Sequence, residues 1–120
     1  MTDVVTERAG VPVLLVGEDG PSIAGPQDAL DVIGAAFSRA EVVAVPVSRF
    51  DERFFALRTG VAGEILQKFV TYRLRLVVVG DVSAYTGAST ALRDLVRESN
   101  RGEQVWFVTD LGELDARLTS

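Results

Sequence analysis

Short apolar runs alternate with amphipathic segments along most of the chain, and this alternation limits the fold more than any other feature. The runs lie at 42–47, 74–79 and 104–108 and are rich in Val, while the segments between them repeat apolar residues every three or four positions. Short runs of this kind are typical of strands buried on both faces. Strands that alternate with helices pair in parallel, so the pattern predicts an α/β fold with a mostly parallel sheet.

The N-terminal part predicts a β-hairpin ahead of this alternation. Residues 4–8 and 11–16 are rich in β-forming side chains, and the turn signal Ala9-Gly10 separates them. Four helices are expected, at 26–39, at 59–72, around Leu92–Ser99 and, as a short helix, after Asp110. We therefore expect one α/β domain over residues 1–120, with a mixed sheet of about five strands and these four helices.

The chain has no cysteine and no histidine. Their absence excludes disulfides, thiolate nucleophiles, the Ser-His-Asp triad and zinc sites that need these ligands. A hydrolase that uses only carboxylates is chemically possible, but no pair of acidic residues shows its spacing. We therefore expect a protein that binds rather than catalyses, with no cofactor and no metal.

The net charge of −5 disfavours nucleic acid as a partner, because phosphate neutralisation needs a basic surface. The charge is uneven, since residues 49–75 carry six cations and three carboxylates, which makes this segment +3 and the remainder −8. One interpretation is a helix with ordinary solvated charges. The other is a positive rim around an anion or an acidic partner surface.

No apolar run approaches the about 18 residues that a membrane span needs. The N-terminal residues also lack the basic and apolar regions of a signal peptide. We therefore expect a cytoplasmic protein without a membrane partner.

Several blocks of the sequence resemble a known bacterial family. They are Phe54–Phe69, Val79–Tyr85, Leu92–Asp94 and Glu98–Gly102. The chain is similar over nearly its whole length to the family catalogued as domain of unknown function 4180. This resemblance implies no particular activity.

The expected order of elements resembles that of STAS domains, the fold of anti-sigma-factor antagonists. The resemblance implies a phosphorylatable Ser or Thr at the start of the helix that follows a parallel strand. Asp51 precedes the expected helix here, and Thr59-Gly60 stands at its start. The usual Asp-Ser-Ser-Gly signature is absent, so the likeness concerns the fold.

Thr59 is the central candidate residue under two interpretations. As an N-cap, its hydroxyl would bond a free amide of the first helical turn and stabilise the protein by about 1 kcal/mol. Alternatively, the free amides and Arg58 would bind an anion, either on a ligand or as a phosphate added to Thr59.

Other candidates follow from position and residue type. Phe54 and Phe55 would point to opposite sides of an extended connection, one into the core and one toward a partner, unless both lie under the loop. Asp81 follows a parallel strand, at the edge where α/β sheets place ligands, although turn formation is the commoner role for such a residue. The complete set of binding or switch candidates is Asp51, Arg53, Phe54, Phe55, Arg58, Thr59, Gly60, Glu64, Asp81, Ser83, Tyr85, Glu98 and Asn100.

Two functions follow from these residues. The first is a non-enzymatic interaction or signalling module that binds a protein partner or a second copy of itself through Asp51–Glu64 and the loop after Gly80. The second is a protein that binds a small molecule or anion, or an enzyme. Its polar pocket would lie at the carboxyl ends of the strands and would comprise Asp51, Arg53, Arg58, Asp81 and Glu98.

Overall fold

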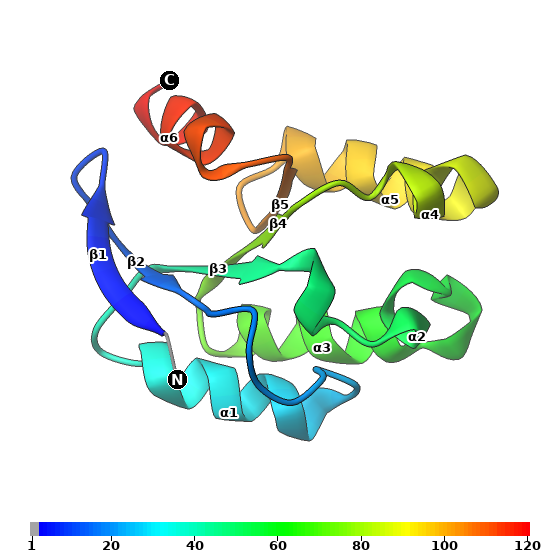
Figure 1. Cartoon of the computed structure of the whole chain (residues 1–120), viewed down its shortest axis with the longest axis horizontal. Coiled ribbons are helices and arrows are strands. Elements are labelled where there is room, and N and C mark those ends of the chain that lie inside the picture. The colour runs from blue at the N-terminus through cyan, green and yellow to red at the C-terminus, as the bar shows by residue number, and fades with distance from the viewer. Residues whose placement is uncertain (1–2) are drawn as a thin grey trace.

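A five-stranded sheet forms the centre of the computed structural model, which describes residues 3–120 (Figure 1). The strands are β1 (Val4–Arg8), β2 (Val11–Leu15), β3 (Val42–Pro46), β4 (Arg75–Val79) and β5 (Val105–Val108). They lie side by side in sequence order, with β1 antiparallel to β2 and all other pairs parallel. The predicted α/β class, the N-terminal hairpin and the mixed sheet of five strands are confirmed.

Six α-helices occur within residues 3–120. They are α1 (Pro26–Ala36), α2 (Glu52–Phe55), α3 (Val61–Thr71), α4 (Ser83–Ala88), α5 (Thr90–Arg101) and α6 (Leu111–Thr119). The expectation of four helices missed α2 and α4, because helices of 4 and 6 residues are too short to repeat an apolar pattern. No helix in the described part of the chain is long and apolar enough to cross a membrane.

Helices cover the two faces of the sheet unequally. Side chains of α1, α3 and α5 share one hydrophobic cluster with alternate strand residues such as Val43 and Val45. The intervening residues, among them Val42 and Ala44, pack with Leu114 of α6 on the other face. This follows from the strand order. The connections between parallel strands are right-handed, and each one leads to the next strand in the same direction across the sheet, so their helices lie on the same face. The sheet therefore has no point where the strand order reverses, which is where doubly wound folds form their ligand crevice.

Polar and aromatic contacts attach α6 to the sheet. Arg8 of β1 donates two hydrogen bonds to Asp115, at 2.6 and 2.8 Å. The guanidinium carbons of Arg75 and Arg117 lie 4.4 and 4.5 Å from the ring centroid of Trp106. The hydrogen bond from Arg8 holds the pKa of Asp115 below its usual value. These contacts orient the only α-helix that covers this face within residues 3–120.

Candidate functional site

The connection between β3 and α3 folds into short helical turns. A 3-10 turn (Val47–Arg49) is followed by α2, and a second 3-10 turn (Leu57–Thr59) leads into α3. Phe54 and Phe55 are 0% and 4% exposed, and their ring centroids lie 5.1 Å apart. Of the two alternatives, the structure shows the one in which both rings are buried, because neighbouring residues of a helical turn do not point to opposite sides as they do in an extended chain.

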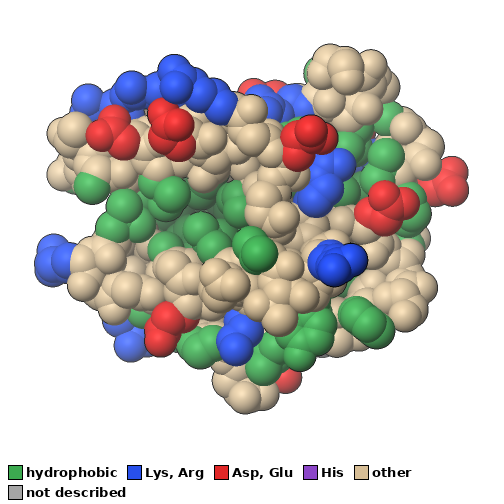
Figure 2. Space-filling view, turned by 180° about the vertical axis from the view of Figure 1, so that it is seen from behind, with side chains coloured by type: hydrophobic (Ala, Val, Ile, Leu, Met, Phe, Trp, Pro, Cys, Tyr) green, Lys and Arg blue, Asp and Glu red, His purple; other side chains and the backbone are tan. Residues whose placement is uncertain are grey.

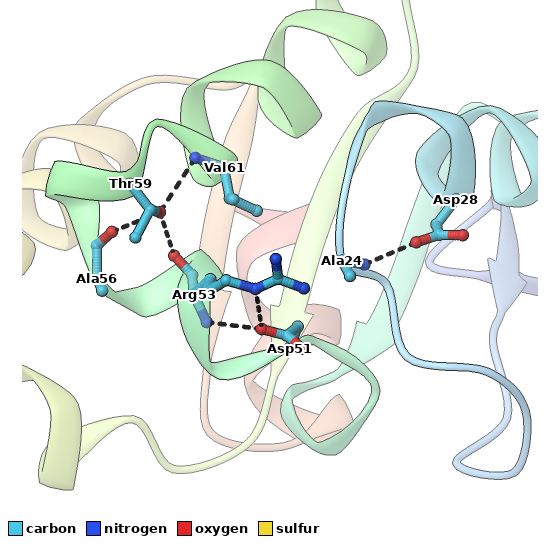
Figure 3. A network of polar contacts seen from close by, with 7 residues as sticks. All are labelled: Ala24, Asp28, Asp51, Arg53, Ala56, Thr59 and Val61. Atoms are coloured by element: carbon cyan, nitrogen blue, oxygen red, sulfur yellow. Dashed lines mark hydrogen bonds and ion pairs between the residues drawn. The ribbon is translucent and has the colours of Figure 1, made fainter.

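Two polar side chains hold these turns (Figure 3). Asp51 Oδ1 accepts hydrogen bonds from the backbone N–H and from Nε of Arg53, both at 2.9 Å. These bonds, with the side-chain bond contributing most, hold the pKa of Asp51 below its usual value. The Thr59 hydroxyl lies 2.8 Å from the carbonyl oxygens of Arg53 and Ala56, to which it donates, and accepts from the N–H of Val61 at 3.3 Å.

The start of α3 differs from the predicted one by two residues. Its N-cap is Gly60, whose φ of +79° lies in the left-handed region that glycine adopts without strain. Thr59 instead belongs to the preceding 3-10 turn, which its hydroxyl ties to the end of α2. A phosphate on Thr59 would remove this donor and lie beside two carbonyl oxygens, so the predicted switch requires the turn to open.

The loop after β4 lies beside this region. Asp81 Oδ1 accepts a 2.8 Å hydrogen bond from the backbone N–H of Ser83, and bonding to Ser83 holds the pKa of Asp81 below its usual value. The ring of Tyr85 in α4 stacks on Phe55 of α2, with centroids 4.1 Å apart and planes inclined by 10°. The structure thus brings together the two segments that were expected to form the working surface.

An apolar groove lies where these two segments meet, and we call it the α2–α4 groove. Its volume is about 410 Å³. It is lined by Glu52, Phe55, Ala56, Leu57, Arg58, Ala84, Tyr85, Ala88, Ser89 and Ala91. Figure 2 shows hydrophobic side chains gathered in a hollow between the part that carries α4 and α5 and the part that carries α2 and α3. Four alanines leave this hollow open, while Glu52, Arg58 and Ser89 supply its polar groups.

A second hollow lies at the carboxyl ends of β4 and β5, and we call it the carboxyl-end hollow. Its volume is also about 410 Å³. It is lined by Gly80, Asp81, Val82, Ser83, Thr86, Arg93, Val96, Arg97, Phe107, Val108, Thr109 and Glu113. The sequence-based prediction named Asp81 and Ser83 but missed Arg93, Arg97 and Glu113. Arg93 and Arg97 are four residues apart, and this spacing places both on one face of a helix. The sequence alone could therefore have indicated that the two arginines act together.

Comparison with known proteins assigns the family. The family profile described as "Domain of unknown function (DUF4180)" matches residues 8–118. The chain belongs to the DUF4180 family. Comparisons with curated proteins and with solved structures give no match. The likeness to STAS domains therefore stays a prediction. In this member of the DUF4180 family, the blocks 54–69 and 79–85 both contribute residues to the α2–α4 groove.

The structure does not place the five residues of the alternative polar pocket in one hollow. Arg58 lines the α2–α4 groove and Asp81 lines the carboxyl-end hollow. Asp51 pairs with its neighbour Arg53, and Glu98 pairs with Arg101 on the exposed side of α5 at 3.1 Å. Each of these two pairs is formed within a single turn of chain, so each carboxylate has a local partner.

The positive rim, one of the two interpretations of the charged segment 49–75, does not form. Arg49 is 6% exposed and donates hydrogen bonds to backbone carbonyls of the loop after β2. Arg75 lies at the start of β4, the opposite end of the strands, where it stacks on Trp106. Glu64 and Lys68 line a separate shallow hollow on α3. Only tertiary contacts could show that this cluster of charges in the sequence is dispersed in space.

Asn100 serves the fold of the last strand. Its Nδ2 donates to the carbonyl oxygen of Phe107 at 3.2 Å, and its Oδ1 accepts from the N–H of Phe107 at 2.7 Å. The amide thereby pairs with the backbone of β5, which lies at one edge of the sheet. Asn100 thus provides hydrogen-bond partners for a backbone N–H and a carbonyl oxygen that have no neighbouring strand at the edge of the sheet.

Replacing Asn100 by Ala is expected to lower the free energy of unfolding by about 2 kcal/mol, because two hydrogen bonds to partly buried backbone groups are lost. Urea denaturation measures this loss. Glu98→Ala is the control on the same helix, with an expected change within about 0.5 kcal/mol because its ion pair is exposed. Equal stability of the two variants would contradict the role assigned to Asn100.

The acidic residues do not form a metal centre. Across residues 3–120, no group of three or more Asp and Glu side chains is arranged to hold a metal ion. The linings of the two hollows offer carboxylates, guanidinium groups, hydroxyls and apolar surface.

Proposed function

We propose that this chain is a non-enzymatic protein-interaction module that binds its partner through the α2–α4 groove. The observation that carries the proposal is an open apolar groove whose base is the stacked pair of Phe55 and Tyr85. A buried aromatic centre with polar groups at its edge is the usual composition of a protein interface.

The lining indicates what kind of partner fits. Ala56, Ala84 and Ala88 give the walls little side-chain volume, so an inserted apolar side chain meets space and apolar surface. Glu52 and Arg58 are part of the rim and offer one charge of each sign to polar groups beside the inserted chain. The partner is therefore an amphipathic segment of another protein, with apolar side chains in the groove and polar side chains opposite Glu52 and Arg58.

Blocking the groove tests the proposal. Ala88→Trp fills it from an exposed position, and Arg58→Ala removes a charge at its edge, whereas Arg101→Ala changes an arginine outside it. The parent and the three variants are each used to capture proteins from cell extract, and the captured proteins are quantified. Each candidate partner is then purified, and its affinity for the four proteins is measured by titration. The expected result is a partner bound at least about tenfold more weakly by Ala88→Trp, and bound normally by Arg101→Ala.

A partner that binds Ala88→Trp as well as the parent would place the interface elsewhere. Failure to recover any partner in repeated captures would count against an interaction module.

The proposed switch at Thr59 is tested with the same partner. Thr59→Val removes the hydroxyl that holds the turn, and Thr59→Glu adds the negative charge of a modified residue. If Thr59 is a switch, Thr59→Glu alone changes the affinity for the partner. Equal binding by the parent and both variants would show that Thr59 only holds the turn.

A further inference from the structure

The carboxyl-end hollow lies between several elements and shares none of its lining residues with the α2–α4 groove. The loop after β4 and residues of α4 form one side, and α5 forms another. The end of β5 and the first turn of α6 complete it. A ligand bound here would contact other residues than the partner proposed above.

The base of the hollow is apolar. Val82 and Val96 come from the loop after β4 and from α5, and Phe107 and Val108 come from the last strand. Both strand residues are at least nine-tenths buried, and they belong to the hydrophobic clusters on opposite faces of the sheet, so the end of β5 is held from both sides. Seven of the twelve lining residues are polar or charged, so the hollow combines an apolar base with polar groups that can orient a small molecule.

Charged groups of both signs surround this base. Arg93 and Arg97 come from one helix, α5, while Asp81 and Glu113 come from the loop after β4 and from α6. The lining therefore carries two positive and two negative side chains, with the cations and the anions on different elements. A phosphate or another simple anion that reaches the two arginines would also meet two carboxylates, which repel it.

Backbone contacts hold the two carboxylates in place. Asp81 accepts its hydrogen bond from the N–H of Ser83, and Glu113 Oε1 accepts from the N–H and the hydroxyl of Thr109, at 2.7 and 3.0 Å. These bonds engage one oxygen of each carboxylate and orient the group. Arg93 makes only a long contact of 3.4 Å, to the carbonyl oxygen of Thr86. Arg97 pairs with the exposed carboxylate of Asp94 on the same helix at 3.1 Å, which leaves its other N–H groups to a ligand.

We propose that the carboxyl-end hollow binds a small zwitterion with an apolar side chain, the chemical class of free α-amino acids. The ligand carboxylate pairs with Arg93 and Arg97, its ammonium group pairs with Asp81 and Glu113, and its side chain covers Val82, Val96 and Phe107. Only a ligand with both charges matches all four charged groups.

A titration followed by backbone NMR separates the contributions of the two ligand charges. The probes are L-leucine, N-acetyl-L-leucine, which keeps the carboxylate but has no ammonium group, and isopentylamine, which has only the ammonium group. L-leucine is expected to shift the amide signals of Val82, Val96 and Phe107 in a saturable way. The two analogues are expected to bind at least about tenfold more weakly, because each lacks the charged group that would pair either with the two arginines or with the two carboxylates.

Variants locate the binding in the hollow. Arg93→Met and Asp81→Asn each remove one charge, and the side-chain amide that Asp81→Asn introduces still offers an oxygen to the N–H of Ser83. Arg101→Met changes the same helix outside the hollow. The first two are expected to weaken L-leucine binding at least about tenfold and the third to leave it unchanged. Thermal unfolding of each variant shows whether it is folded, and Arg97→Met replaces Arg93→Met if that variant is not.

Two results would overturn the proposal. One is the absence of saturable shifts with L-leucine up to about 10 mM, a concentration that exceeds even a millimolar Kd. The other is binding of N-acetyl-L-leucine as tight as that of L-leucine, which would show that the site takes anions. Neither result would affect the proposal for the α2–α4 groove, because the two sites share no residue.

Discussion

Replacing Phe54 by Ala is expected to lower the free energy of unfolding by about 3–5 kcal/mol. Phe54 is completely buried, and the centroid of its ring lies 4.3 Å from that of Phe50 and 5.1 Å from that of Phe55. Truncation removes these contacts and leaves a cavity that helical turns on both sides cannot easily close. A domain of this size has about 5–15 kcal/mol of stability, so the loss is a large share of the total.

Urea denaturation of the parent and of Phe54→Ala measures the effect. Phe37→Ala is the matched control, because Phe37 is 56% exposed and its truncation is expected to cost much less. Similar losses for the two variants would show that the aromatic cluster around α2 contributes little to stability. Because Phe55 packs on Phe54 and stacks on Tyr85, Phe54→Ala is also expected to weaken partner binding in the α2–α4 groove.

Replacing Arg49 by Leu is expected to lower the free energy of unfolding by about 3 kcal/mol. The buried guanidinium donates to the carbonyl oxygens of Gly17, Asp19 and Pro21, at 2.8, 3.2 and 3.1 Å. Leu fills part of the space but leaves these oxygens without their donor, and an unsatisfied buried polar group is costly. Gly20 shows how closely the loop packs, because a Cβ there would lie 2.9 Å from the guanidinium carbon.

Urea denaturation and hydrogen exchange test the role of Arg49 together. Arg39→Leu is the control, since Arg39 is exposed and its loss is expected to change stability within about 0.5 kcal/mol. Arg49→Lys is expected to be destabilising as well, because an ammonium group lacks the planar set of N–H donors with which the guanidinium reaches the three carbonyl oxygens. Arg49→Leu is expected to speed amide exchange near Ile23, whose N–H bonds the carbonyl oxygen of Arg49. Unchanged stability and exchange would contradict this account.

Periodic apolar patterns predicted most of the architecture. Val42 and Val43 begin a run that is buried on both faces, and this run is β3 as expected. The 3.6-residue repeat of Ile65 and Phe69 located α3 to within two residues at its start. These patterns are informative because a helix or strand that packs against a core needs an apolar residue at each position that faces it. Helices α2 and α4 have too few turns to produce such a repeat, so the sequence pattern predicts loops at their positions.

The candidate sites were predictable only in part. Phe55 and Tyr85 were both named as candidates, yet the stacking that joins them depends on how α2 and α4 pack against α3 and α5. The alternative hypothesis places Asp51 and Asp81 in one pocket, but each carboxylate bonds the backbone two residues further along the chain. A local hydrogen bond of this kind is available in almost any tertiary arrangement, so it competes strongly with a distant partner.

Residue types and their spacing were enough to establish the α/β class, the hairpin, the membership in the DUF4180 family and the absence of His and Cys chemistry. Each of these properties can be read along the chain without knowing which segments meet. Packing in three dimensions was needed to show that Arg49 is buried while Arg58 lines a groove, and that the charges of 49–75 are dispersed. The reason is that the binding properties of a charged side chain depend on its neighbours in space, and those come from segments far apart in the sequence.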